Sequence, residues 1–247
     1  MSQPLNNAPI RLNRSQLAVP GSQPRFFEKA RMSSADIIML DMEDSVAPDD
    51  KPTARENIIK TLNEDDWSSK TVSCRINASD THFMYRDLID VVENAGQHID
   101  LIMLPKVENA AMVQMIDTLL SQIEANKSLP KKIGIELQIE SALGIQNITE
   151  IASASSRTES LHYGPGDYAA SIHARSTSIG GQSPDYPGDM WHYALSRIVI
   201  AARANGLRPI DGPISNFNDP SAFIESAKQS AALGFEGKWA IHPTQIE

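Results

Sequence analysis

The stretch Ile37-Ile-Met-Leu-Asp-Met42, followed at once by Glu43 and Asp44, carries the clearest evidence for the fold. Its apolar side chains run on without the polar alternation of a strand that is exposed on one face. Such a run is typical of a strand in a parallel sheet that is covered on both faces. The acids at its carboxyl end are the first of several charged groups that follow predicted strands.

Similar short apolar runs recur along the whole chain, with longer helical patterns between them. We predict eight strands, at Leu17–Val19, Ile37–Met42, Val72–Asn77, Leu101–Lys106, Ile133–Ile139, Leu161–Gly164, Leu207–Asp211 and Lys238–His242. Apolar residues at helical spacing predict helices at Asn109–Glu124 and at Asp189–Ala204, the latter ending at Asn205-Gly206. Thr53 and Glu56 form a capping-box pattern that opens a third helix.

This strict alternation predicts a parallel sheet closed into a TIM, or (β/α)8, barrel. A doubly wound open sheet is the competing architecture, but Val19-Pro-Gly-Ser22 lacks its glycine-rich dinucleotide turn. Because such a barrel takes about 250 residues, residues 1–247 are predicted to form one catalytic domain. We expect the final barrel helix and a C-terminal lid to be absent. Ser171–Pro187, rich in Gly, Ser and Pro, predicts a long loop on the catalytic face.

The amino-acid composition limits the kinds of partner that this protein can bind. With 22 basic and 31 acidic side chains, the net charge is −9, which argues against nucleic acid or an anionic membrane as the main partner. No stretch reaches the roughly 18 apolar residues of a membrane span, and the N-terminus lacks the apolar region of a signal peptide. The single cysteine, Cys74, forms no intramolecular disulfide and is interpreted as a core residue. Together these features predict a cytoplasmic protein.

Charged residues mark the carboxyl ends of most predicted strands, where barrel enzymes carry their active sites. Because charged groups avoid burial unless they are paired or bind metal, we expect them to meet at one mouth. For any single residue, the alternative is a cap or a side chain near solvent; His242 is interpreted as structural. The set comprises Asp41, Glu43, Asp44, Arg75, Lys106, Glu136, Glu140, Asp167, Asp211 and His242.

Several carboxylates around one mouth repel one another unless a cation holds them. Oxygen donors without a Cys or His pair favour a hard ion such as Mg²⁺. We predict Glu140 and Asp167 as the metal ligands, with Glu43 and Asp44 holding metal-bound waters. The alternative for Glu140 is an acid that caps the next helix.

Other residues are candidates for binding substrate. Arg75 suits a bidentate clamp on a carboxylate, or else an ion pair with the acids of the second strand. Gly164 and Gly166, in a Gly-Pro-Gly turn, would let backbone N–H groups approach a ligand, although such turns are common. Arg25 and Lys29 open the first helix and either bind phosphates or form a solvated face.

Taken in order, these stretches resemble the citrate lyase β-subunit-like acyl-CoA lyases of the HpcH/HpaI aldolase superfamily, most closely the malyl-CoA lyase branch. The resemblance runs through nearly the whole chain. The matching segments are Leu17–Ser22, Leu40–Pro48, Cys74–Asn77, Met103–Val107, Ile139–Gly144, His162–Tyr168, Pro187–Ala194, Arg208–Pro213 and Gly234–Pro243.

The resemblance implies a TIM barrel that uses Mg²⁺ or Mn²⁺ to cleave a 3-hydroxyacyl-CoA reversibly by retro-Claisen chemistry. Malyl-CoA or β-methylmalyl-CoA would yield acetyl-CoA or propionyl-CoA and glyoxylate. The family assembles as trimers or hexamers, and a lid acid from a neighbouring subunit is the implied base. The residues that match are Glu140 and Asp167 for the metal, Glu43 and Asp44 for its waters, Arg75 for the oxo acid, and Arg25 and Lys29 for the CoA phosphates. Lys106, at the end of the fourth predicted strand, is a further candidate for binding substrate or CoA.

Three other functions fit the same sequence features. A citramalyl-CoA lyase would release pyruvate in place of glyoxylate. A metal-dependent aldolase acting on free hydroxy-oxo acids would have no need of Arg25 and Lys29. A barrel scaffold subunit would keep the fold without the activity.

Overall fold

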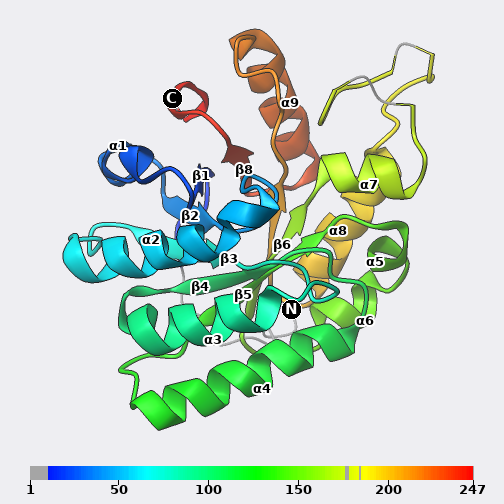
Figure 1. Ribbon diagram of the computed structural model, residues 1–247. Helices are drawn as coiled ribbons and strands as arrows, with labels where there is room; N and C mark the ends of the chain where they lie inside the picture. The colour runs from blue at the N-terminus through cyan, green and yellow to red at the C-terminus, as the bar shows by residue number, and fades with distance from the viewer. Residues whose placement is uncertain (1–10, 176–177, 184, 247) are drawn as a thin grey trace.

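The computed structural model describes residues 11–175, 178–183 and 185–246. Its strands are all parallel and pair in sequence order, and β1 pairs with β8, so the sheet closes into a barrel (Figure 1). The predicted TIM barrel is therefore confirmed, and the open sheet is excluded. The strands are β1 (Ser15–Pro20), β2 (Ile37–Asp41), β3 (Thr71–Arg75), β4 (Leu101–Leu104), β5 (Gly134–Ile139), β6 (Thr158–Tyr163), β7 (Arg208–Asp211) and β8 (Gly237–Ala240).

Helices surround the strands on the outside (Figure 1). No helix among the described residues is long and apolar enough to cross a bilayer. Residues 172–191, which cover most of the predicted long loop, contain no helix or strand in their described part. The α-helices are α1 (Phe27–Arg31), α2 (Lys51–Glu64), α3 (Met84–Ala95), α4 (Ala110–Lys127), α5 (Ala142–Gln146), α6 (Ile148–Ala152), α7 (Pro165–Ser171), α8 (His192–Ala204) and α9 (Pro220–Leu233).

Two of the predicted helix ends are confirmed and one is wrong. The Asn109 side chain caps α4 by accepting the N–H of Met112 at 3.1 Å, and Gly206 has a φ of 71° just after α8. The capping box at Thr53 is wrong, since α2 already begins at Lys51. A 3₁₀ turn runs directly into α2 there, and a proline fits the first helical turn because it needs no N–H partner.

The burial of β2 shows why its sequence is apolar throughout. Ile38 and Leu40 belong to the large core between the strands and the outer helices, together with Ile58 of α2. Met39 faces the barrel interior, where it packs with Trp239 and others. Both faces of the strand are therefore removed from water, which accounts for the missing polar alternation.

Candidate active site

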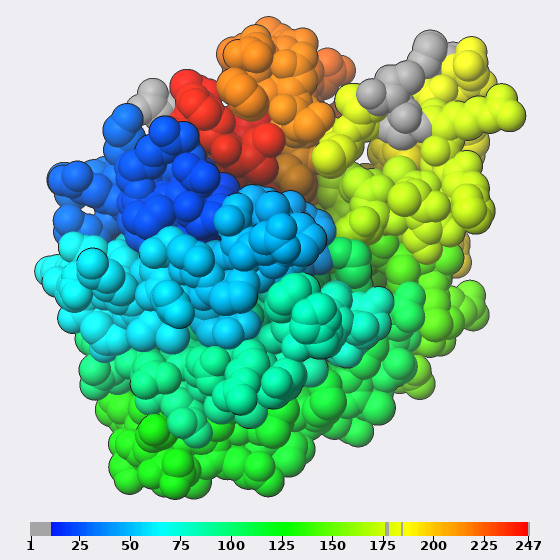
Figure 2. Space-filling view, viewed as in Figure 1, coloured from blue at the N-terminus to red at the C-terminus, as the bar shows by residue number. Residues whose placement is uncertain are grey.

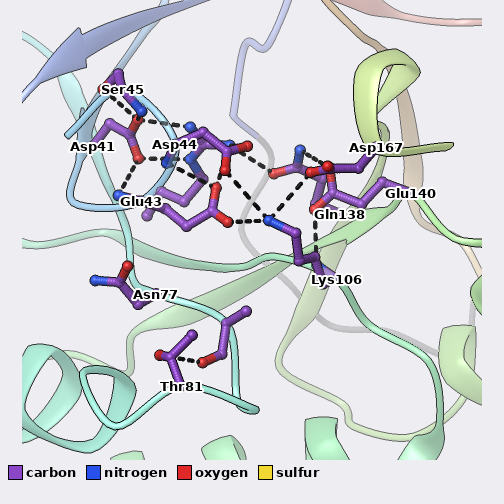
Figure 3. A network of polar contacts seen from close by, with 12 residues as sticks. Asp41, Glu43, Asp44, Ser45, Asn77, Thr81, Lys106, Gln138, Glu140 and Asp167 are labelled. Carbon is purple, nitrogen blue, oxygen red and sulfur yellow. Dashed lines mark hydrogen bonds and ion pairs between the residues drawn. The ribbon is translucent and has the colours of Figure 1, made fainter. Parts of the chain in front are cut away.

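Seven charged side chains meet at the carboxyl ends of β2 to β6, as predicted (Figure 3). We call this group the mouth cluster. Its floor is buried and its rim is open, since the side chain of Glu43 is 6% exposed and that of Asp44 is 55% exposed. The mouth cluster consists of Asp41, Glu43, Asp44, Arg75, Lys106, Glu140 and Asp167.

Two residues expected at the mouth lie elsewhere. Glu136 is fully buried inside the barrel, on β5 and four residues before Glu140, which directly follows that strand. Because side chains alternate along a strand, it shares the interior face with Glu140 but lies deeper. His242 is half-buried and stacks on Phe217, and its side chain caps the 3₁₀ turn Pro243–Gln245; its interpretation as a structural residue agrees with this position.

Asp211 is a third correction. Its neighbour Ile210 faces the barrel interior, so Asp211 points outward. Its carboxylate forms an ion pair with Lys238 of β8 and accepts the hydroxyl of Ser230 on α9 at 2.6 Å. Asp211 therefore fastens α9 to the barrel wall and takes no part in the mouth.

Arg75 is held rigidly by the acids of the second strand. Its Nε and Nη2 atoms each lie 2.6 Å from one oxygen of Asp41, a bidentate pair. Its Nη1 lies 3.1 Å from Glu43 Oε2 and donates to Gln138 Oε1 at 3.3 Å. Burial raises the pKa of Asp41, but the Arg75 pair and the hydroxyl of Ser45 outweigh it and leave that pKa below its usual value. The ion-pair alternative for Arg75 is thus observed, and the pair lies in the mouth.

Lys106 connects the two sides of the cluster from an uncommon backbone conformation. Its φ of 51° is left-handed, which costs free energy for a residue with a side chain. In this conformation its N–H donates to Glu140 Oε1 at 2.8 Å. Its Nζ contacts Glu43 and lies 3.3 Å from Asp44 and 3.2 Å from Asp167. This conformation places the Lys106 amine among three carboxylates and its backbone N–H on a fourth.

Glu140 is a buried acid that is poorly compensated. Its Oε2 accepts Gln138 Nε2 at 2.5 Å, and burial with the charges of Glu43 and Asp167 raises its pKa to about 8. Burial, with the charge of Asp44, likewise raises the pKa of Glu43 to about 7. The helix-cap alternative for Glu140 is wrong, because Ser141 is the cap of α5.

Gly164 makes room for Glu140. A Cβ atom at this position would lie 2.2 Å from Glu140 Oε2, whereas one at Gly166 would meet nothing closer than 3.5 Å. The N–H of Gly164 donates to the carbonyl of Ile139 at 3.2 Å, so its predicted role as a donor to a ligand is wrong. Pro165 begins α7, which makes the Gly-Pro-Gly stretch a helix start and places Asp167 in the first turn.

Arg25 and Lys29 lie on the exposed surface near the N-terminal end of the chain, coloured dark blue in Figure 2. The guanidinium of Arg25 stacks over Phe26 at 4.8 Å, and Phe27 is buried. Both basic groups are free of the ion pairs seen among the described residues. Their contact with CoA phosphates stays a prediction.

Three contributing residues were missed. Gln138 bridges Arg75 and Glu140, and its signal was present in Glu136-Leu-Gln-Ile-Glu140, where polar residues alternate along an otherwise apolar strand. Lys51 donates to the carbonyls of Met42 and Glu43 at 3.0 and 2.8 Å. Asn77 accepts the same amine at 2.5 Å. Nothing in the sequence distinguishes Lys51 from a lysine on a helix surface.

The donor set of the mouth suits a hard divalent cation. Five carboxylates face two cationic side chains, Arg75 and Lys106, and uncompensated buried charge is costly. In the described chain, no three or more His, Cys, Asp or Glu side chains are arranged to enclose a metal ion. Mg²⁺ commonly takes one or two protein carboxylates and fills the remaining positions with water or substrate oxygens. Glu140 and Asp167 fit that requirement.

Beside the cluster lies a cavity of about 670 Å³, lined by Lys106, Glu140 and Asp167 together with loop residues such as Ser79 and Ser141. This volume is within the usual range for small-molecule sites, about 300–1,000 Å³. The fold and the site together define a TIM-barrel enzyme with an acidic catalytic mouth.

Comparison with known proteins specifies the family. Residues 14–243 match the HpcH/HpaI aldolase/citrate lyase family, and the chain belongs to that family. It is 48% identical to the L-malyl-CoA/beta-methylmalyl-CoA lyase of Rhodobacter capsulatus over 97% of this chain and 78% of that protein. It is 30% identical to the malyl-CoA/beta-methylmalyl-CoA/citramalyl-CoA lyase of Chloroflexus aurantiacus over 99% of this chain and 75% of that protein.

A solved structure shares the barrel. Protein CitE from Mycobacterium tuberculosis, in complex with magnesium, acetoacetate and coenzyme A, superimposes with a TM-score of 0.76. The two sequences are 29% identical, and the match covers 95% of this chain and 78% of that one. A relative of this fold therefore binds magnesium, an oxo acid and coenzyme A.

Proposed function

We propose that this protein cleaves malyl-CoA or β-methylmalyl-CoA reversibly to acetyl-CoA or propionyl-CoA and glyoxylate. The observation that carries the proposal is the convergence of Arg75, Lys106, Glu140 and Asp167 on one mouth. Its support is the 48% identity to a lyase named for these two substrates. The chemistry is a retro-Claisen cleavage. The substrate hydroxyl loses its proton and becomes the carbonyl of glyoxylate as the neighbouring carbon–carbon bond breaks, and the thioester enolate that leaves takes up a proton to give acetyl-CoA or propionyl-CoA.

Glu140 and Asp167 would hold Mg²⁺ or Mn²⁺, while Glu43 and Asp44 would hold its waters. When bound, the ion polarises the carbonyl of the 2-oxo acid and orients its carboxylate. Gln138 and the N–H of Lys106 each donate to Glu140, so they orient that carboxylate.

Arg75 supplies fixed positive charge to the reacting atoms. Asp41 holds its Nε and Nη2, which leaves Nη1 directed toward Glu43 and Gln138. A donor that is fixed before the reaction stabilises the developing enolate oxygen without any cost of reorganisation. Lys106 adds a second cation at the same mouth and contacts substrate oxygens.

The remaining parts of the proposal come from the resemblance. Arg25 and Lys29 bind the CoA phosphates, and the chain assembles as a homotrimer or homohexamer. In the lyases that it resembles, a lid acid of a neighbouring subunit takes the hydroxyl proton. The protein acts in the cytoplasm, where Cys74, which is buried and unpaired, stays reduced.

The test is a coupled assay of glyoxylate release from malyl-CoA, with and without Mg²⁺. We expect Arg75→Ala to lower kcat by about 10²-fold or more, the usual cost of losing one such donor. Arg75→Lys keeps the charge but loses the bidentate fork, and the exposed Arg86→Ala on α3 is the matched control. Magnesium-independent release, or near-normal turnover by Arg75→Ala, would remove these residues from the mechanism.

The same assay distinguishes the proposed lyase from the other candidate functions. The relative from Chloroflexus aurantiacus is also named for citramalyl-CoA, and release of pyruvate from that thioester measures this activity. One methyl group is worth about 1–3 kcal/mol of discrimination, so both substrates require comparison at equal concentration. Turnover of free hydroxy-oxo acids without CoA would favour the aldolase, and no turnover of any substrate would favour the scaffold.

A further inference from the structure

A line of buried polar side chains runs through the barrel interior up to Arg75 of the mouth cluster, and the proposed chemistry uses only this last residue. It starts at Gln16 and Glu136, passes through His162 and Trp239, and ends at Arg75. None of the five residues is more than 5% exposed. Buried polar groups require hydrogen-bond partners. Each contact in this line therefore limits the orientations that the next side chain can adopt.

The direction of one hydrogen bond determines which ring nitrogen of His162 carries the proton. Trp239 Nε1 lies 2.8 Å from His162 Nδ1, and an indole N–H is only a donor. His162 Nδ1 therefore accepts, and the ring proton is on Nε2. That atom lies 3.2 Å from Glu136 Oε1 and 2.8 Å from the hydroxyl of Ser160. The neutral imidazole thus joins the indole to the carboxylate in one tautomer only.

Glu136 anchors the line. Its carboxylate accepts Gln16 Nε2 at 3.0 Å, the hydroxyl of Ser73 at 2.6 Å and that of Ser160 at 3.3 Å. With His162 as a fourth partner, the Glu136 carboxylate is satisfied by residues of β1, β3 and β6. An anchor held from several strands cannot rotate without breaking several hydrogen bonds.

Trp239 connects this hydrogen-bonded network to Arg75. The guanidinium carbon of Arg75 lies over the indole ring, 5.5 Å from its centroid, and tryptophan is the strongest aromatic partner for a cation. Met39, Met103 and Ile210 pack around the same indole. Asp41 controls the guanidinium through hydrogen bonds at two nitrogens, whereas the indole supports it through the face of its ring.

We propose that Trp239 is a positioning residue for Arg75, and that Glu136 and His162 fix the plane of its indole. The inference rests on the proposed function of Arg75. If it holds, a change at His162, which touches no substrate, lowers turnover by tilting the surface on which the guanidinium rests. Misplacement of a catalytic group by about 1 Å can cost about 10²-fold in rate.

The experiment compares substitution of Trp239 with substitution of another buried tryptophan. Trp67, Trp191 and Trp239 are each 3–4% exposed, and each indole N–H donates a hydrogen bond, but Trp67 and Trp191 donate to the carbonyls of Thr61 and Gly181. We expect Trp239→Phe to lower kcat for malyl-CoA by about tenfold or more, while KM changes less than about threefold. Trp67→Phe is the matched control, with kcat unchanged.

At His162 two variants separate positioning from packing. His162→Leu removes both hydrogen bonds and is expected to lower kcat as Trp239→Phe does. His162→Gln offers an acceptor to the indole and a donor to Glu136, so it is expected to restore most of the rate. Equal loss in His162→Leu and His162→Gln would overturn the inference.

A magnetic resonance measurement tests the same contact without turnover. In ¹⁵N-labelled protein, we expect His162 Nδ1 unprotonated and Nε2 protonated, and the Arg75 Nε–H shifted by the ring current of the indole. That shift should change in Trp239→Phe, where a smaller ring replaces the indole, and in His162→Leu. An unshifted Arg75 signal in the parent protein would overturn the inference even if the lyase is active, whereas a shifted signal in an inactive protein would contradict only the proposed function.

Discussion

At the scale of single residues, the site depends on how much space each side chain leaves for its neighbour. Glu140 is buried against Gly164 and accepts two hydrogen bonds. The negative charge of Asp167 contributes to its raised pKa. The glycine is needed for this close approach and not for an unusual φ, since its φ is −107°. A single methyl group is therefore enough to displace the predicted metal ligand.

Gly164→Ala is expected to weaken Mg²⁺ affinity by about tenfold or more, because its Cβ would collide with the Glu140 carboxylate. Titration calorimetry with Mg²⁺ measures this change directly. Gly166→Ala, two residues away, would bring its Cβ only to ordinary van der Waals contact with Ile179; it is the matched control and should bind normally. Equal affinity in the two variants would show that Glu140 does not hold the ion.

At the scale of elements, α2 supports the loop after β2. Lys51, in the first turn of α2, is buried and donates to two carbonyls of that loop and to Asn77. Burial lowers the pKa of Lys51, although nearby acids, Glu43 first among them, oppose this. The helix thereby holds Glu43 and Asp44 in place through one amine.

Lys51→Met should therefore lower kcat and destabilise the protein by about 1–3 kcal/mol, since buried acceptors lose a charged donor. Lys60→Met on the same helix is the matched control, because that side chain is 69% exposed and lies 3.9 Å from Glu64. Exposed pairs of this kind contribute about 0–1 kcal/mol. Urea unfolding and the lyase assay together check both variants; a Lys51→Met protein of unchanged stability and rate would contradict this role.

At the scale of the whole molecule, buried and half-buried ion pairs connect elements that are distant in sequence. Asp41 pairs with Arg75 at the mouth, and Asp117 of α4 pairs with Arg157 just before β6. Burial raises the pKa of each carboxyl, but hydrogen bonds and the arginine charge outweigh it, so both pKa values lie below 3.8. The unfolded chain therefore binds protons at a higher pH than the folded protein does.

A lowered carboxyl pKa makes a stabilising contribution that is complete above the unfolded value and is lost as pH falls through the folded value. We expect the free energy of unfolding to decrease steadily as pH falls below about 4. Urea titrations at pH 6, 4 and 3 measure the decrease. Asp117→Asn should flatten the dependence, since it removes one of the shifted groups; an unchanged slope would exclude Asp117 as a contributor.

Much of the fold and part of the site were predictable, for a physical reason. Chain order and apolar runs determine which residues end each strand, and parallel strands bring those ends to one mouth. Glu43, Asp44, Arg75, Lys106 and Glu140 were found in this way. The resemblance then assigned roles to positions that the pattern had already marked.

What only the tertiary structure decided was the side to which each residue turns and the partner it meets. Asp211 and Ile210 are consecutive, and closure of the barrel sends one outward to α9 and the other inward. Lys51 reaches Asn77 across 26 positions, and Trp239 reaches His162 across 77. Such contacts depend on strand tilt and on the packing of helices against the sheet, which no local pattern encodes. The sequence by itself determined the barrel and the residues at its mouth; the folded chain determined how they are held.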